Sequence, residues 1–241
     1  DGALLNGDTD TDPKPLGHGT AVATTLAAVT NNGTGTAAPA FLAKVYPVII
    51  SDPDGWGYDS TVIVGILKAQ ENGIRLINLS FQSFPPHTYA DQADHPVLHA
   101  YLKQYHDDYN GLFFNGAGNS EFADPNPRTS NLIMISGTDK FDRLAFFTNT
   151  GSPLWFAAPA VLVQASDRNG QTQFVNGTSF AGPLACGVAA QILSKFPHLT
   201  NDQILDLMAR TARREMNGYH PSLYGYGIPD AGRATKGKKL R

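Results

Sequence analysis

Three short glycine-rich segments carry the side chains best suited to chemistry: His18, Asn119 and Ser179. His18 stands in the sequence GHGT, where a helix is predicted to begin, and Ser179 stands in NGTSFAGP at the start of a long alanine-rich helix. Asn119 ends the sequence NGAGN, directly after a short apolar run. An imidazole and a hydroxyl at such positions are candidates for the base and the nucleophile of covalent catalysis. Because 101 residues separate His18 from Asn119 and 60 separate Asn119 from Ser179, only tertiary folding can bring them together.

The segments around these residues alternate between strand-like and helix-like patterns. Apolar periodicity predicts helices over 18–30, 60–72, 94–109, 179–195 and 201–213, with Asp94 as one N-cap. Apolar runs predict strands over 41–50, 74–80, 112–114 and 132–136, and short strands with turns over 144–165. This alternation is typical of an α/β fold with a mostly parallel central sheet and helices on both faces. Active groups in such folds lie at the carboxyl ends of strands and the amino ends of helices.

The composition indicates a folded chain, whose length suits one or two domains, and it argues against two classes of partner. The chain has 241 residues, of which 41% are hydrophobic and 16% charged, and its formal net charge is −3. This charge offers no basic surface for nucleic acid, and no apolar run approaches the roughly 18 residues of a membrane span. We therefore expect no nucleic-acid partner and no membrane partner. Cys186 is the only cysteine, so the chain has no internal disulfide and no cysteine-based metal cluster.

The ordered set of glycine-rich segments resembles the motifs of the subtilisin-like serine proteases (subtilases). The sequence GHGT at 17–20 is similar to the histidine motif of that family, GAGN at 116–119 to its oxyanion asparagine motif, and GTSFAGP at 177–183 to its serine motif. Their order and rough spacing also agree, and shorter matches extend the resemblance over essentially the whole chain. The resemblance implies a subtilisin-like fold and a single catalytic domain over residues 1–241.

The same resemblance implies a serine endopeptidase that hydrolyses peptide bonds through an acyl-enzyme. Ser179 is the implied nucleophile and His18 the implied general base. The Ser179 backbone N–H and the Asn119 side-chain amide are the implied donors to the oxyanion. No cofactor is required for this chemistry. Structural calcium is an expectation from the family, and we assign no metal ligands.

Two further segments match those that pair with an extended substrate strand in this family: GWGY at 55–58 and SFQS at 80–83. The predicted substrate-binding residues are Gly55, Trp56, Gly57, Ser80, Phe81, Gln82, Gly116, Ala117 and Gly118. Trp56 is expected to line an apolar pocket upstream of the scissile bond. Gln82 and Ser83 stand where the family usually has two glycines, so the shape and specificity of the cleft are expected to differ from the family pattern.

The catalytic acid of the family has no match in this sequence. In subtilases it ends an apolar strand upstream of the histidine and is followed by Ser or Thr and then Gly, and no Asp here has that context. Asp8, Asp10 and Asp12 precede His18 in a polar loop, and we interpret them as solvated, with calcium binding or a substitute acid as alternatives. We expect that a segment with the acid and its strand is missing from this chain or supplied separately. The sheet would then keep an unpaired hydrophobic edge, and the chain alone would be weakly active or inactive.

Other interpretations fit the same residues less fully. A non-catalytic pseudoprotease that binds extended peptides or partner proteins is the main alternative, because the acid is lost and the cleft edge is altered. An α/β-hydrolase esterase would use Asp202 or Asp206 and then His220, but the run from Gly177 to Gly182 is one residue longer than Gly-x-Ser-x-Gly.

A zinc site at His95 and His99, which share a predicted helical face, lacks a suitably spaced carboxylate. The partners that we expect are a protein or peptide substrate and a separate N-terminal segment or propeptide. From the resemblance alone we expect a secreted or extracytoplasmic protein.

Overall fold

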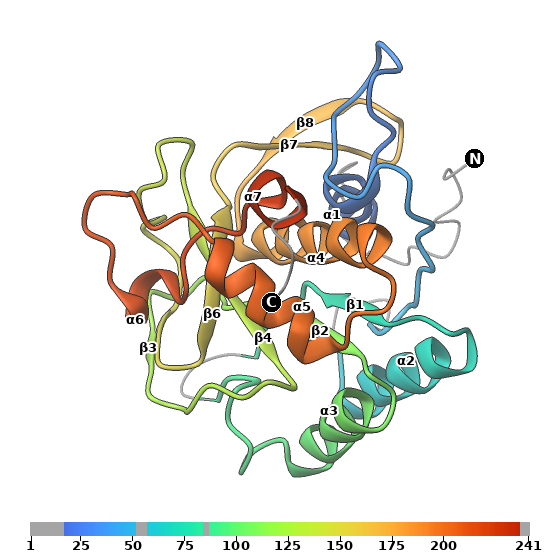
Figure 1. Ribbon diagram of the computed structural model, residues 1–241, viewed down its shortest axis with the longest axis vertical. Helices are drawn as coiled ribbons and strands as arrows, with labels where there is room; N and C mark the ends of the chain where they lie inside the picture. The colour runs from blue at the N-terminus through green and yellow to red at the C-terminus, as the bar shows by residue number, and fades with distance from the viewer. Residues whose placement is uncertain (1–16, 52–56, 84–86, 237–241) are drawn as a thin grey trace.

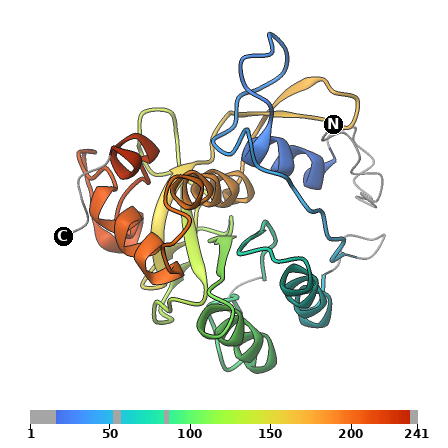
Figure 2. The same cartoon turned by 45° about the vertical axis from the view of Figure 1, so that its right-hand side comes forward.

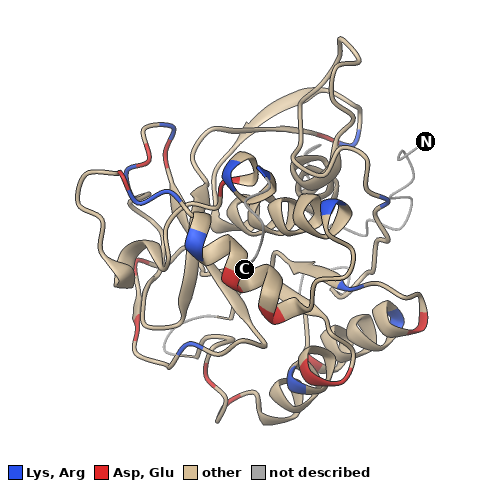
Figure 3. Ribbon diagram, viewed as in Figure 1, with Lys and Arg blue, Asp and Glu red and all other residues tan. Residues whose placement is uncertain are grey.

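The centre of the molecule is a sheet of four parallel strands, which run in the order β1, β2, β4, β6 (Figure 1). The computed structural model describes residues 17–51, 57–83 and 87–236. The strands are β1 (Leu76–Leu79), β2 (Leu112–Gly116), β4 (Ile133–Thr138) and β6 (Leu154–Pro159). No strand of this sheet contains a charged residue, and charges lie on the outer helices and loops (Figure 3). The predicted parallel sheet is confirmed.

Helices cover both faces of this sheet, as predicted (Figures 1 and 2). One face packs against α2 (Asp59–Glu71) and α3 (Pro96–Asp107), and the other packs against α4 (Thr178–Lys195) and α5 (Asn201–Thr211). Two short helices, α6 (Pro221–Tyr224) and α7 (Ala231–Thr235), follow in the carboxyl-terminal part of the chain. Among the described residues, no helix is both long enough and apolar enough to cross a membrane.

Successive side chains of the central strands pack alternately in two separate hydrophobic cores. Phe113 of β2 and Met134 of β4 pack in the core under α2 and α3. Their neighbours Phe114 and Ile135 pack in the core under α4 and α5. Successive side chains of a strand point to opposite faces, so a strand buried on both faces reads as a continuous apolar run. Full burial of each such side chain contributes about 1.5–3 kcal/mol.

A small hairpin extends this framework beside α1 (His18–Ala27). It consists of β7 (Val163–Ser166) and β8 (Thr172–Val175), which pair antiparallel. Its turn is organised by Asp167, whose carboxylate accepts the backbone N–H groups of Asn169 and Gln171. The backbone N–H of Gln171 is the main cause that holds the pKa of Asp167 below its usual value. A second small sheet pairs β3 (Ala123–Asp124) with β5 (Thr150–Gly151).

Two predictions about individual elements are wrong. Residues 41–50 are largely apolar but form no strand, and residues 44–50 have no regular structure. A strand needs a partner for its backbone groups, and none of the described strands pairs with this segment, nor with the outer edge of β1. The second correction concerns α3, which begins at Pro96 rather than at Asp94, because proline suits the first helical turn. The Asp94 carboxylate instead contacts the ring of His87.

The apolar side chains of this irregular segment remain in contact with solvent. The exposed residues are Phe41, Leu42, Val45, Tyr46, Val48 and Ile49. One side of the segment is held by α2, since the Thr61 hydroxyl donates to the Ile50 carbonyl and Gly65 approaches the side chain of Val48. The segment is therefore anchored to the molecule at α2 while much of its apolar surface is uncovered.

Candidate active site

The end of β2 meets the beginning of α4 at a point where side chains have no room. A Cβ on Gly116 would lie 2.6 Å from the carbonyl oxygen of Thr178. Gly118 has a φ of +108°, and a Cβ there would lie 2.4 Å from the side-chain nitrogen of Asn149. Both positions therefore require glycine. This close approach places Asn119, which follows Gly118, next to the amino terminus of α4.

The carboxamide of Asn119 is held by Thr178, the first residue of α4. Its oxygen Oδ1 accepts the backbone N–H of Thr178 at 2.8 Å and the Thr178 hydroxyl at 3.1 Å. The same hydroxyl accepts the backbone N–H of Gly118 at 3.0 Å. With its oxygen occupied in this way, the carboxamide offers its NH2 group as a donor beside Ser179. The motif around Ser179 did not indicate this role for Thr178.

Ser179 is the second residue of α4, so its backbone N–H belongs to the first helical turn and has no partner within the helix. The preceding N-cap, Gly177, has a φ of +139°, a backbone conformation that side chains disfavour. The Ser179 side chain is half-buried. A hydroxyl at this end of a helix lies in the positive field of the helix dipole, which favours negative charge.

The carbonyl of Ser179 accepts a hydrogen bond from a side chain at the end of β1. Pro183, four residues further along α4, has no N–H to donate to it. The hydroxyl of Ser80 donates to this carbonyl at 2.6 Å, and the Asn78 side chain donates in turn to that hydroxyl at 2.9 Å. The end of β1 is thereby fixed to the turn of α4 that carries Ser179.

His18 is the first residue of α1, and its ring lies beside the start of α4. The ring centroids of His18 and Phe180, the residue after Ser179, are 5.9 Å apart. Ala21 of α1 and Phe180 also belong to one buried cluster. Gly17, with a φ of +58°, turns the chain into α1 under the side chain of Arg168, which a Cβ would meet at 2.5 Å. The structure thus brings the three predicted segments to one region.

The two segments predicted to flank the substrate also lie against each other. A Cβ on Gly57 would come within 2.9 Å of the Phe81 ring, so these two residues are in direct contact. Gly57 also forms an isolated β-bridge with Ser51. Gly55 and Trp56 lie outside the described residues, and so do Asp8, Asp10 and Asp12, the alternatives considered for the acid.

A small pocket opens directly beside Ser179 and Asn119. Its other lining residues are Ser80, Phe81, Gln82, Gly116 and Thr178. The volume is about 10 Å³, which is room for about one water molecule. The Gln82 side chain crosses to the neighbouring segment, where its oxygen Oε1 accepts the backbone N–H of Asn119 at 2.8 Å.

Asn149 supports the site in a way that its sequence did not indicate. It is buried, and its side chain donates to the Ala117 carbonyl at 3.0 Å. Its side-chain oxygen accepts the N–H groups of Ser120 at 2.9 Å and Phe122 at 3.1 Å. The loop that carries Asn119 is therefore held on both sides by one residue. No motif surrounds Asn149, so only the folded contacts reveal its part.

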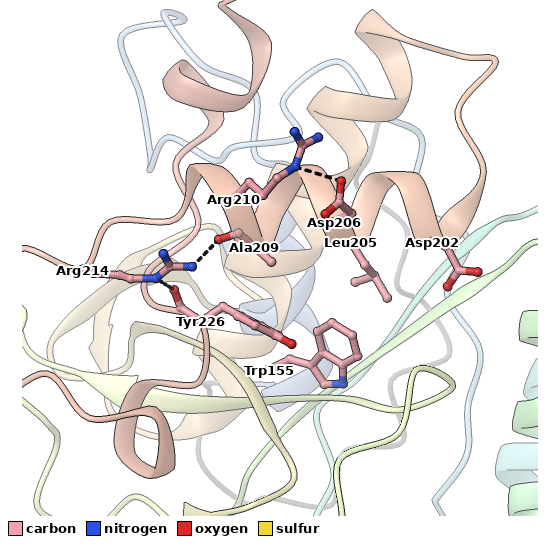
Figure 4. A pocket seen from close by; sticks show the side chains of 8 residues that line it. All are labelled: Trp155, Asp202, Leu205, Asp206, Ala209, Arg210, Arg214 and Tyr226. Carbon is pink, nitrogen blue, oxygen red and sulfur yellow. Dashed lines mark hydrogen bonds and ion pairs between the residues drawn. The ribbon is translucent and has the colours of Figure 1, made fainter. Parts of the chain in front are cut away.

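A larger pocket of about 420 Å³ lies away from these residues (Figure 4). Trp155, at the amino end of β6, lines it, whereas Asn119 follows the carboxyl end of the parallel strand β2. Its charged groups have partners within the protein. Arg210 pairs with Asp206, and Arg214 donates to the carbonyls of Tyr226 and Ala209. This pocket is therefore at the opposite edge of the sheet from the candidate site.

The residues considered for other chemistries have separate roles. His95 contacts the Asp59 carboxylate at 2.9 Å, and His99 contacts the Tyr89 carbonyl at 2.8 Å. Burial lowers the pKa of His99. Within the described ranges no group of three or more His, Cys, Asp or Glu side chains is arranged to hold a metal ion. His220, considered for an esterase, accepts the N–H of Ser222 and caps α6.

Comparisons with known proteins agree on one family. A model described as "Subtilase family" matches residues 5–227. The thermostable alkaline protease of Halalkalibacterium halodurans is 33% identical over 222 residues, which cover 91% of this chain and 58% of that protein. Subtilisin BL of Lederbergia lenta is 32% identical over 222 residues, which cover 91% of this chain and 78% of that protein. The chain spans just over half the length of the first of these relatives.

Solved structures give the same result for the fold. A protease structure from Pseudoalteromonas arctica superposes with a TM-score of 0.76 at 27% identity, and the match covers 91% of this chain and 70% of that one. A lanthipeptide protease superposes with a TM-score of 0.75 at 21% identity, over 92% of this chain and 76% of that one.

Proposed function

Because the chain belongs to the subtilase family, we propose that it is the catalytic domain of a serine endopeptidase. The observation that carries this proposal is the Asn119 carboxamide, which Thr178 holds at the amino terminus of α4, one residue before Ser179. A side-chain amide and a helix-terminal N–H beside a hydroxyl are donors suited to a developing oxyanion.

The proposed reaction proceeds through an acyl-enzyme on Ser179. Ser179 Oγ attacks the carbonyl carbon of the substrate, and His18 accepts the hydroxyl proton. The carbonyl oxygen gains negative charge, to which the Ser179 N–H and the Asn119 amide donate. The C–N bond then breaks, and the leaving amine takes the proton from His18. Water releases the acyl group by the same steps, with His18 again accepting and returning a proton.

We further propose that the carboxylate that orients His18 comes from an additional extended segment beside β1. Two observations support this: the outer edge of β1 pairs with none of the described strands, and the apolar side chains between Phe41 and Ile49 are exposed. An added strand could satisfy the backbone groups of β1 and cover apolar surface. Without such an acid, turnover falls by about 3 × 10⁴ in subtilisin itself. Residues 1–241 would then be one catalytic domain that lacks a strand.

Labelling with a fluorophosphonate tests the assignment of the nucleophile. Ser179 Oγ forms a bond to phosphorus, fluoride leaves, and the hydroxyl proton passes to the base. We expect one adduct by intact-protein mass spectrometry, no adduct in Ser179→Ala, and slower labelling in His18→Ala. Ser60→Ala is the matched control, because this serine lies exposed on α2. The proposal would be refuted if the wild-type chain stayed unlabelled both without and with an added upstream segment.

A peptide-binding pseudoprotease is the second candidate, and the small volume of the pocket that Gln82 lines favours it. Such a protein would bind extended peptides in the cleft without acylating Ser179. Peptide binding by calorimetry together with an absence of labelling at Ser179 would select this function.

The remaining proposals rest on family membership. They are a protein or peptide substrate, a propeptide or separate N-terminal segment, structural calcium, and a secreted or extracytoplasmic location. The relatives named above are an alkaline protease and a subtilisin, which agree with a protein substrate.

A further inference from the structure

We propose that Gln82 restricts the substrate residue on the acyl side of the scissile bond to glycine or alanine, because its side chain closes the pocket beside Ser179. This inference rests on the proposed function, since it concerns the substrate of the same site. It concerns a position at which the chain departs from the family pattern and a long polar side chain connects the segments 80–83 and 116–119.

Bond lengths determine where the side chain of that substrate residue must lie. The carbonyl carbon under attack lies about 3 Å from Ser179 Oγ, and its oxygen lies about 3 Å from the Asn119 amide. The adjoining Cα is about 1.5 Å from the carbonyl carbon. The side chain on that Cα therefore begins in the space between Ser179 and Asn119. The small pocket lies in this space, since both residues line it.

The space available there is too small for most side chains. A volume of about 10 Å³ corresponds to about one water molecule. Glycine places nothing in the pocket, and alanine adds a single methyl group. Leucine or phenylalanine would displace atoms of the lining. Gly116 contributes no side chain to that lining, so it does not cause the closure.

Gln82 is held in its closing position. Its oxygen Oε1 accepts the Asn119 N–H at 2.8 Å, and it lies 3.5 Å from the position that a Cβ would take on Gly118. A larger substrate side chain would have to move Gln82 and break this hydrogen bond, which would leave the Asn119 N–H without its acceptor. Both the volume and the hydrogen bond therefore oppose large residues.

Two phosphonofluoridates that differ only in the group on phosphorus test this inference on the full 241-residue chain. Phosphorus takes the place of the carbonyl carbon, so a methyl group on it stands for the Cα of glycine, whereas a benzyl group adds a phenyl ring as the side chain on that Cα. The ratio of their labelling rates at Ser179 cancels the nucleophilicity that both reactions share. We expect wild type to react about tenfold or more faster with the methyl reagent. Gln82→Ala should raise the ratio of the benzyl rate to the methyl rate about tenfold, whatever the loss of the acceptor for the Asn119 N–H does to both rates together.

Two variants separate the size of Gln82 from other effects of substitution. Gln82→Glu retains the length of the side chain and an acceptor for the Asn119 N–H, so it should keep the preference for the methyl reagent. Gln104→Ala makes the same chemical change on the exposed surface of α3 and should behave as wild type. Circular dichroism of each variant verifies that it is folded.

Each outcome decides the matter. Equal labelling of wild type by both reagents, or a folded Gln82→Ala variant that still rejects the benzyl reagent, would overturn the inference while leaving Ser179 as the nucleophile. Failure of both reagents on wild type and Gln82→Ala, both with and without an added upstream segment, would overturn the proposed function and this inference with it. A selective gain of benzyl labelling in Gln82→Ala would support both.

Discussion

Removal of the Ser80 hydroxyl should weaken the start of α4 by an amount that the contacts define. Pro183 offers no N–H to the Ser179 carbonyl, and the Ser80 hydroxyl donates to it at 2.6 Å. In Ser80→Ala that carbonyl loses its donor, and the Asn78 side chain loses an acceptor at 2.9 Å. A fully buried polar group without a partner costs about 1–3 kcal/mol, and these groups are half-buried, so the free energy of unfolding should fall by about 1 kcal/mol, the lower end of that range.

The reactivity of Ser179 should fall as well, because the turn that carries its hydroxyl is less firmly held. We expect fluorophosphonate labelling to slow about tenfold, which corresponds to about 1.4 kcal/mol in activation free energy. The rate is measured by intact-protein mass spectrometry, and the stability by urea denaturation followed by circular dichroism. Ser60→Ala, on the exposed surface of α2, should change neither quantity.

A double-mutant cycle tests the physical reason for this effect. Pro183→Ala supplies a backbone N–H that can donate to the Ser179 carbonyl in place of the Ser80 hydroxyl. Ser80→Ala should therefore cost about 1 kcal/mol less in the Pro183→Ala background than in the wild-type chain. Equal costs in the two backgrounds would show that the missing N–H of Pro183 is not what makes the Ser80 hydroxyl necessary, and the reasoning would fail.

Three further changes have expected outcomes. Asn119→Ala should slow the labelling of Ser179 by about 10²–10³, the loss known for this donor in subtilisin itself, and an unchanged rate would contradict the oxyanion assignment. Burial raises the pKa of the Cys186 thiol to about 12, so iodoacetamide at pH 8 should modify it only after urea unfolds the protein. The thiol ionises near its ordinary value of 9.0 only in the unfolded chain, so the free energy of unfolding should decline above pH 9, and less so in Cys186→Ala. Tyr105→Phe removes the hydroxyl that donates to the Ile74 carbonyl at 2.8 Å, so the free energy of unfolding measured in urea should fall by about 1–2 kcal/mol. An unchanged urea midpoint would show that this hydrogen bond does not stabilise the fold.

Local patterns were sufficient to predict most of the sheet and its helices. The run at 112–114 became β2 because its residues are apolar on both faces, as a strand between two layers of helices requires. The run at 41–50 is also largely apolar, but it contains Lys44 and Pro47, and it forms no strand. Strand formation also depends on a pairing neighbour, which no local pattern specifies.

The candidate site was predictable to the extent that it depends on glycine. Gly116 and Gly118 stand where another side chain would collide, and such positions leave a motif in the sequence. The supports of the site left no such signal. Asn149 acts through hydrogen bonds to residues 27 to 32 positions away, and Ser80 through one to a residue 99 positions away, which only the folded chain reveals. At Gln82 the sequence indicated only a departure from the family pattern. It did not indicate whether the cleft would be wider or narrower there.

The exposed apolar residues of 41–49 and the outer edge of β1, which pairs with none of the described strands, also bear on how the protein behaves in concentrated solution. Two copies could align their free edges and satisfy one another's backbone groups, so self-association should increase with protein concentration. A ligand that occupied the edge would compete with this process and keep the protein monomeric. Sedimentation over a range of concentrations would therefore report on the state of the edge without any measurement of catalysis.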